Sequence, residues 1–370
     1  KSALKSISSN DDEKVTSYFL DELILYSIEQ RASDIHIEKY QDLCLFKFRV
    51  DGRLRIFFSF DEELFRVFSS FVKLISNLDM TQIRLALDGR FSRNINDKKY
   101  DFRLSTMPTI EAESIVLRVL DNKNIDKKLN DLGLSQDIYE NLKDILKLTQ
   151  GLILISGPTG SGKTTTLYSI LKELNSDDKK IITVEDPIEY KIDSINQVPI
   201  NDKVGLSFEL VLKNILRQDP DIIFIGEIRD KFSLDIALQA SLTGHLVLAS
   251  IHSSSSVETI TRLIDLKADP FLISTTLKAV MAQRLVLAHC KSCENGCKKC
   301  NFTKFYDRTS ISEILKVDEQ ISSLIFNKAS FNELKEYLKN INFKTMLDDG
   351  KQKVKDGLTT LEEVYKVVNF

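Results

Sequence analysis

The sequence lacks the features of a membrane-spanning or exported protein. None of its apolar runs approaches the roughly 18 consecutive residues that a transmembrane helix needs. The opening residues, Lys1 to Leu4, show no signal-peptide pattern and no initiator Met, so we expect a chain that has lost part of its natural N-terminus. Any membrane association would therefore be peripheral. Without export, the five cysteines are expected to be reduced.

An excess of charge of one sign is also missing. The 370 residues include 51 Lys and Arg against 54 Asp and Glu, for a formal net charge of −3. Near neutrality argues against bulk binding to nucleic acid, and no basic stretch is interleaved with aromatic residues in the way that tracks single strands. The composition, 28% charged and 42% apolar, is that of an ordinary globular protein. Its length is sufficient for two or three domains.

The first 122 residues predict a small α+β domain. Residues 1–14 are polar, and we interpret them as a disordered linker remnant. Helices are expected at 15–30 and 62–78, and alternating apolar positions predict strands near 35–37, 43–47, 54–56, 99–104 and 115–120. Asp51-Gly52, between two of these strands, is a hairpin signal. The domain would occupy residues 15–122, and a polar linker would follow at 123–130.

From residue 131 onward, predicted strands alternate with predicted helices. The strands are expected at 152–156, 180–184, 221–225 and 246–250, and the helices at 164–174, 207–217 and 231–242. This order implies parallel strands with helices on both faces. Ligands of such sheets bind at the carboxyl ends of the strands.

A phosphate-binding loop lies between the first strand and the first helix of this region. Its sequence is Gly-Pro-Thr-Gly-Ser-Gly-Lys-Thr, and its glycines allow backbone N–H groups to turn toward a phosphate chain at a helix N-terminus. Lys163 can reach the outer phosphates, and the Thr164 hydroxyl is placed to hold Mg²⁺. The predicted nucleotide-binding residues are Gly157, Pro158, Thr159, Gly160, Ser161, Gly162, Lys163, Thr164 and Thr165.

Three more polar clusters follow at the ends of apolar strands. They are an acidic turn at 184–189, a segment at 216–230 that contains Glu227, and a segment at 243–252 that contains two of the four histidines. A carboxylate such as Glu227 after an apolar strand is placed to meet Mg²⁺ or to orient a water molecule. Singly, these residues fit helix caps, surface pairs or core side chains equally well. After a phosphate loop at this spacing, they indicate catalytic residues.

These blocks resemble those of the secretion ATPase superfamily, specifically the assembly ATPases of type II secretion, type IV pilus and competence systems. In that family they are an Asp box (here 184–189), a Walker B segment (216–230) and a His box (243–252). Further resemblance lies at 31–38, 88–90, 103–106, 282–285, 347–350 and 357–364. The resemblance spans about residues 15–370.

The resemblance implies a fold of the α/β class. A RecA-like P-loop NTPase core at 131–287 would follow a small PAS-like α+β domain and precede a helical C-terminal subdomain at 304–370. It also implies a cytoplasmic ATPase motor that forms a homo-hexameric ring, peripheral at the inner membrane. The motor would use ATP and Mg²⁺ to push an inner-membrane platform protein that builds a pilus or pseudopilus. A cytoplasmic docking protein would bind the missing N-terminus.

The resemblance also implies roles for particular residues. The catalytic set would be Lys163, Glu185, Glu227, Arg229, His252 and two arginines of the first domain, Arg90 and Arg103, while His245 and Arg217 would contact the nucleotide. Thr164 and Glu227 would hold Mg²⁺. The division of roles between Glu185 and Glu227 stays open. So do three alternatives for the whole chain: a retraction-type pilus ATPase, a translocase related to DNA uptake or conjugation, and a non-hydrolytic scaffold.

Four cysteines form a separate cluster at 288–303. Cys290 and Cys293 make one C-x₂-C pair, Cys297 and Cys300 make a second, and this pattern predicts a structural Zn²⁺ held by four thiolates. The extension ATPases of the resembled family have a tetracysteine site with a longer spacer, whereas the retraction class generally lacks it. Reduced surface thiols, or a partial site completed by His289, are the alternatives. The fifth cysteine, Cys44, is expected in the core.

Overall fold

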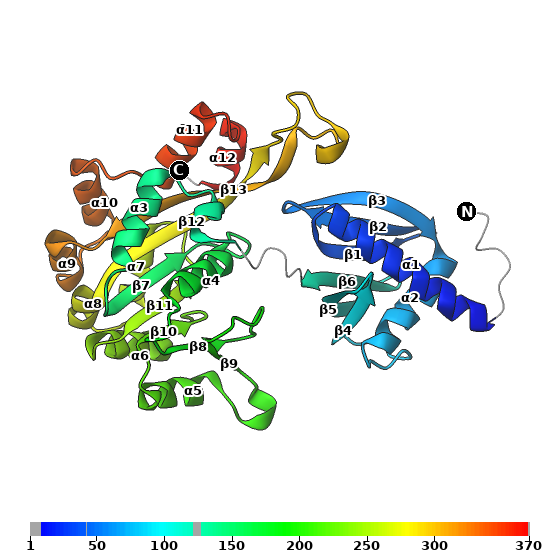
Figure 1. The fold of residues 1–370 in the computed structure, drawn as a ribbon, viewed down its shortest axis with the longest axis horizontal. Helices are drawn as coiled ribbons and strands as arrows, with labels where there is room; N and C mark the ends of the chain where they lie inside the picture. Colours follow the sequence, from blue (N-terminus) through cyan, green and yellow to red (C-terminus); the bar gives the residue numbers. More distant parts are fainter. Residues whose placement is uncertain (1–8, 42, 121–126, 369–370) are drawn as a thin grey trace. The chain divides into compact units, whose positions relative to one another are not determined.

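The computed structural model describes residues 9–41, 43–120 and 127–368, and the chain divides into two compact units, residues 1–123 and 124–370 (Figure 1). The division falls where the sequence predicts the linker. Residues 121–126 lie outside the described residues, as do 1–8 of the expected linker remnant. Each unit has its own sheet. No helix of the described residues has the length and apolar character to cross a membrane.

The first unit is an antiparallel sheet of six strands in the order β3-β2-β1-β6-β5-β4. Two helices pack against each other and against this sheet, and the shared core contains Leu20 and Phe68 of the helices and Phe102 of the sheet. The elements are α1 (Ser9–Glu29), β1 (Ala32–Tyr40), β2 (Leu43–Val50), β3 (Arg53–Asp61), α2 (Glu62–Ile75), β4 (Leu87–Ile95), β5 (Lys98–Pro108) and β6 (Glu113–Leu120).

Two details of this unit test the sequence-based expectations. The hairpin is confirmed, because Asp51 and Gly52 both have positive φ, 51° and 86°, in a two-residue turn between paired Val50 and Arg53. The disordered segment expected at 1–14 is wrong in its last part, because α1 begins at Ser9. Strand β4 was not predicted. It carries Arg90, and two of its less exposed positions are Gly89 and Arg93, so apolar residues do not alternate regularly along it.

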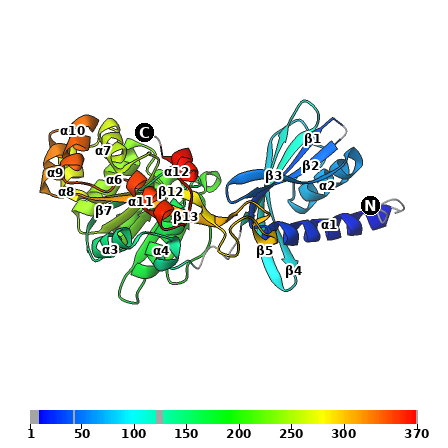
Figure 2. The same cartoon turned by 90° about the horizontal axis from the view of Figure 1, so that it is seen from above.

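The second unit is built on a seven-stranded sheet in the order β13-β12-β7-β11-β10-β8-β9 (Figures 1 and 2). All neighbouring strands are parallel except β13, which runs antiparallel to β12. The predicted parallel sheet is thus confirmed. The strands are β7 (Gly151–Ser156), β8 (Ile181–Glu185), β9 (Asn196–Pro199), β10 (Ile222–Ile225), β11 (Leu246–Ile251), β12 (Leu277–His289) and β13 (Phe305–Lys316).

Helices cover both faces of this sheet. Along β7, Leu152 and Leu154 face one core while Ile153 and Ile155 face the other, as the two-residue period of a strand requires. The first core is covered by α5 (Phe208–Ile215), α6 (Lys231–Leu242), α7 (Ser256–Asp265), α8 (Pro270–Thr276), α9 (Glu319–Phe326) and α10 (Phe331–Asn340). The second is covered by a 3₁₀ turn (Leu129–Leu132), α3 (Gln136–Ile145) and α4 (Lys163–Leu174).

The C-terminal part differs from its sequence-based description. Residues 304–370 are predicted to be helical, but β13 comes first and extends the ATPase sheet beyond the expected limit at residue 287. Helices α11 (Met346–Lys355) and α12 (Leu361–Val367) then pack on β12 and β13 through residues such as Met346 and Val364. The strands went unpredicted because both are buried over long stretches and lack a simple alternation.

Candidate functional site

The parallel strands bring several polar segments to one edge of the sheet. In register, Ser156 of β7 lies beside Ile251 of β11, and Ile225 of β10 lies beside Val184 of β8. The segments that follow these strands start with Gly157, Asp186, Gly226 and His252. We call this the carboxyl edge. The predicted phosphate loop and the carboxylates of the Asp box and Walker B segment therefore share one end of the sheet.

The loop at residues 157–164 has the shape of a phosphate cradle. The Lys163 ammonium lies at the start of α4 and donates hydrogen bonds to the carbonyls of Gly157 and Pro158, at 2.6 and 3.1 Å. A Cβ atom on Gly157 would come within 2.6 Å of the Gln283 carbonyl, so only glycine fits there. The Ser161 hydroxyl is buried and makes no hydrogen bond within the described part of the chain. These features fit a bound phosphate chain.

The electrostatics of Lys163 point to the same ligand. Burial, opposed by Glu227 and assisted by the nearby Arg284, lowers the pKa of its ammonium to about 8. Burial makes the charged form of this ammonium unfavourable, and an anion that approaches it stabilises the charge. The triphosphate of a nucleotide supplies that charge.

Gln283 supports the loop from β12. Its amide donates to the Ser161 carbonyl at 3.0 Å and accepts from the Thr166 hydroxyl at 2.8 Å, and it is 2% exposed. A Cβ atom on Gly162 would come within 2.8 Å of the same amide nitrogen. The sequence places Gln283 in a block that resembles the family but gives it no role. Its contact with the loop spans more than a hundred residues.

Glu227 is a partly accessible carboxylate at the carboxyl edge. Its side chain is 25% exposed. One oxygen lies 2.9 Å from Nε2 of His252, and the other accepts from Nε of Arg229 at 3.0 Å. Nδ1 of His252 lies 3.1 Å from the Gly157 carbonyl, so the histidine joins Glu227 to the phosphate loop. Arg229 also approaches Asp186, at 3.6 Å.

Glu185 has a different environment. It is the last residue of β8, it is 3% exposed, and its carboxylate accepts hydrogen bonds from the hydroxyls of Tyr168 and Thr183 and from the amide of Gln197. The Thr183 and Gln197 contacts measure 2.5 and 3.2 Å. Tyr168, on α4, is fully buried and was not predicted as a functional residue. The geometry therefore gives the two carboxylates different surroundings: Glu227 faces the phosphate loop, and Glu185 is held inside the fold.

Two predicted nucleotide-binding residues lie at the other end of the sheet. His245 directly precedes β11, its carbonyl accepts from Gly151 at the start of β7, and its Nδ1 lies 2.9 Å from the Ala240 carbonyl. Arg217 is exposed in the turn before β10 and pairs with Asn214. Six residues of strand at about 3.3 Å each separate this amino edge from the phosphate loop by about 20 Å. Within this chain, His245 and Arg217 therefore lie away from the phosphate loop, and their contact with a nucleotide stays a prediction.

Arg90 and Arg103 belong to the first unit. They are register partners on β4 and β5, so their side chains start from neighbouring points of one sheet. Arg90 is exposed and Arg103 is half-buried. Arg103 also lies beside Arg118 of β6, which is paired with Asp34 at 2.9 Å. Three arginines therefore start from neighbouring positions on β4, β5 and β6.

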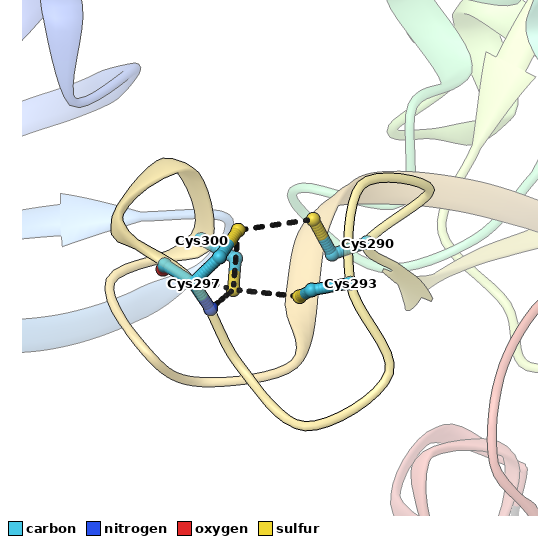
Figure 3. A group of neighbouring side chains, drawn as sticks. All are labelled: Cys290, Cys293, Cys297 and Cys300. Carbon is cyan, nitrogen blue, oxygen red and sulfur yellow. Dashed lines mark hydrogen bonds between the residues drawn. The ribbon is translucent and has the colours of Figure 1, made fainter.

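The four cysteines of the predicted zinc site converge (Figure 3). Their sulfur atoms all lie within 4.8 Å of one another, and the pairs Cys290–Cys297, Cys293–Cys300 and Cys297–Cys300 are 3.9, 3.6 and 3.8 Å apart. Four thiolates about 2.3 Å from a tetrahedral zinc ion would be separated by about 3.8 Å. The N–H of Cys297 donates to the sulfur of Cys300 at 3.2 Å and lowers the pKa of that thiol to about 6. The donor set fits Zn²⁺.

The remaining cysteine and the nearby histidine lie outside this cluster. Nδ1 of His289 lies 2.9 Å from the Gly357 carbonyl, and its ring stacks on Phe305. His289 is therefore held toward the C-terminal helices, which disfavours a partial site that it would complete. Cys44 is fully buried in the first unit, as predicted, and burial raises the pKa of its thiol to about 12.

Known proteins resemble this chain over most of its length. Residues 9–366 match the family of the type II/IV secretion system protein. The chain belongs to this family. Over 98% of its length it is 39% identical to the type II secretion system ATPase E of Vibrio cholerae, of which it covers 76%. To the type II secretion system protein E of Pseudomonas aeruginosa it is 37% identical over 98% of its length, covering 77% of that protein.

Solved structures of the same class share the fold of this secretion-family chain. The ATPase DotB of Legionella pneumophila matches with a TM-score of 0.77 and 25% identity, and the alignment covers 95% of each chain. The pilus retraction motor PilT with bound ADP matches with a TM-score of 0.69 and 26% identity, over 95% of this chain and 97% of that one. The suspected superfamily is confirmed. The chain is an ATPase of the secretion and pilus class.

Proposed function

We propose that this chain hydrolyses ATP to ADP and phosphate and uses the energy to drive a type II secretion or pilus-type assembly machine. The observation that carries the proposal is the meeting of the phosphate loop, Glu227 and His252 at one edge of the sheet. The relatives in Vibrio and Pseudomonas are named as type II secretion proteins, and they align with nearly the whole chain.

ATP with Mg²⁺ would bind at the loop. Backbone N–H groups of 157–165 would hold the phosphates, and Lys163 would exchange its bonds to two carbonyls for bonds to phosphate oxygens. Thr164 and Glu227 would hold the Mg²⁺, which neutralises charge on the β- and γ-phosphate oxygens when bound. Glu227, oriented by His252 and Arg229, would position the attacking water and accept its proton.

Glu185 would act indirectly. Its carboxylate is occupied by three hydrogen bonds inside the fold, so we assign it the task of fixing the end of β8 and the Asp box. This divides the roles that the sequence leaves open between Glu185 and Glu227.

Arg90 and Arg103 would supply positive charge from the first unit. Paired guanidinium groups on neighbouring strands suit the spread negative charge of a transferring phosphoryl group. Such a contribution requires the first unit to approach a nucleotide site, in the same subunit or in a neighbouring one. We propose a homo-hexameric ring on the cytoplasmic face of the inner membrane, which works on a membrane platform protein and is held by a cytoplasmic docking protein.

The four-cysteine cluster favours the extension or secretion type over the retraction type. It brings four sulfur atoms together at the spacing of a zinc site. A retraction motor is the second candidate, because the PilT structure shares the fold over most of both chains.

The first test is the Lys163→Ala variant. Loss of the ammonium that contacts the loop carbonyls of Gly157 and Pro158 should abolish ATP turnover, by a factor of about 1,000 or more. The measurement is phosphate release by the purified chain. Lys180→Ala, at the amino edge, is the matched control and should keep turnover within about twofold. Turnover retained by Lys163→Ala would refute the assignment of the site.

A further inference from the structure

A single buried carboxylate joins the starts of two helices. Glu313 lies on β13 and is 5% exposed. One of its oxygens accepts from both the backbone N–H and the hydroxyl of Ser256, each at 2.7 Å, and the other accepts from the N–H of Met346 at 2.9 Å. Ser256 is the first residue of α7, and Met346 is the first residue of α11. The carboxylate therefore accepts from N–H groups that have no partner within either helix, and it lies at both positive helix ends.

The α7 side of this link begins at the nucleotide site. His252, which contacts Glu227 and the Gly157 carbonyl, is followed by Ser253, Ser254 and the helix cap Ser255. Arg284 donates to the Ser254 carbonyl at 3.0 Å, and its charge interacts with Glu313. The 252–255 segment is thus fixed at its far end by Arg284 and Glu313.

The α11 side leads to the first described residues after the linker. Asp349 accepts from the hydroxyl of Ser135 and from the N–H of Ser312, the latter at 2.8 Å. Lys353 donates to the Gly133 carbonyl at 2.7 Å and pairs with Asp349 at 3.3 Å. Both side chains are buried. Helix α11 is therefore tied to residues 133–135 at one side and to Glu313 at the other.

We propose that Glu313 is a positioning residue for ATP hydrolysis, through which the placement of α11 and residues 133–135 sets the placement of His252 beside Glu227. The proposal rests on the proposed ATPase function. Glu313 itself touches neither the phosphate loop nor Glu227. Glu313 acts by fixing the start of α7. The 252–255 segment, which carries His252, runs directly into this helix.

The test uses Glu313→Gln in the full chain. The amide keeps the shape of the side chain, but its –NH₂ group cannot accept a hydrogen bond, so it can serve the N–H group of one helix and not of both. We expect kcat to fall about tenfold while KM for ATP stays within about twofold, since small misplacement of a catalytic group costs rate rather than binding.

A second measurement needs no turnover. The sequence has four histidines, so selective ¹³C labelling of the histidine rings gives a spectrum in which a His252→Gln variant identifies the His252 signal. Glu313→Gln should shift the His252 ring signal and leave that of His36, in the first unit, in place. Ser256→Ala, which removes one donor to Glu313, should shift the same signal less.

A cycle with Asp349→Asn tests the link to α11. Asp349 is hydrogen-bonded to Ser135 and Ser312 rather than to the 252–255 segment, yet its substitution should move the His252 signal. Combined with Glu313→Gln, its effect should largely disappear, because the path is already cut.

Loss of stability alone must be excluded. Ile325 lies on α9 and is fully buried in the core. Ile325→Ala should lower the unfolding temperature without removing any hydrogen bond of Glu313. If Ile325→Ala changes kcat and the His252 signal as much as Glu313→Gln does at equal loss of stability, or if Glu313→Gln changes neither, the proposal is overturned. Should the parent chain fail to hydrolyse ATP, the proposed function fails, and the His252 signal still decides the positioning role.

Discussion

The two edges of the second sheet have similar residue types but different surroundings. At the carboxyl edge, Lys163, Glu227 and His252 form one connected set around the phosphate loop. At the amino edge, the side chains of His245 and Arg217 contact neighbouring turns, at Ala240 and Asn214. Strand direction makes the difference, because one motif can start at the amino edge and finish at the carboxyl edge. A motif that is continuous in the sequence therefore need not form one site.

The His box shows this most directly. His245 and His252 flank the same six-residue strand, β11, and belong to one motif. Only His252 follows the strand and reaches the loop. Substitutions at each edge can test whether the carboxyl edge alone supports ATP turnover within a chain.

The largest effect is expected for Glu227→Gln. Removal of the carboxylate that faces the phosphate loop should lower kcat by about 100- to 1,000-fold while nucleotide binding is kept. Phosphate release and the binding of a fluorescent ATP analogue measure the two quantities. Glu185→Gln is the matched control: it should lower kcat less but destabilise the fold more, by about 1–3 kcal/mol, because buried donors lose a charged acceptor. If Glu185→Gln lowered kcat more than Glu227→Gln does, the roles assigned to the two carboxylates would have to be exchanged.

A smaller effect is expected for the histidines. His252→Ala removes hydrogen bonds to Glu227 and to the Gly157 carbonyl and should lower kcat about 10- to 100-fold, as a bond to a charged group is worth about 1.5–3 kcal/mol. His245→Ala should leave kcat within about twofold. Steady-state kinetics of both variants, measured in the same state of assembly, tests this difference in kcat. Equal losses would show that the amino edge also reaches a nucleotide, which would then belong to another subunit.

The smallest effect on turnover is expected for metal removal, since the cysteines lie at neither edge. The chain should carry about one zinc ion, and chelation should expose four thiols to iodoacetamide at pH 8. The fifth, Cys44, should stay unlabelled because its pKa of about 12 keeps it protonated. Mass spectrometry counts the labels, and phosphate release should change by less than about twofold. Less than half an equivalent of zinc would contradict a structural site.

Much of this architecture follows from local sequence. Buried parallel strands produce continuous apolar runs, so β7, β8, β10 and β11 are recognisable, and the loop after β7 has a fixed residue pattern. The four cysteines lie within eleven residues, so their cluster is also local.

The rest depends on contacts between distant positions. Glu185 and Glu227 both follow apolar strands, and only Tyr168 and Gln197, brought near by folding, distinguish them. Gln283 reaches the phosphate loop from over a hundred residues away, and Glu313 links positions 57 and 33 residues distant. No period or motif marks such residues. Their roles arise from burial and hydrogen bonding in the folded chain.

The four-cysteine cluster lies in the connection between β12 and β13, and this placement has a consequence for how the chain can vary. The two strands are already paired from Ala279–Lys316 to Leu287–Arg308 before the cysteines begin, so the alignment of the sheet does not depend on the connection. Residues can be added or lost there without shifting Gln283 under the phosphate loop. The three-residue spacer between the cysteine pairs is thus one length among several that the same motor core can accept.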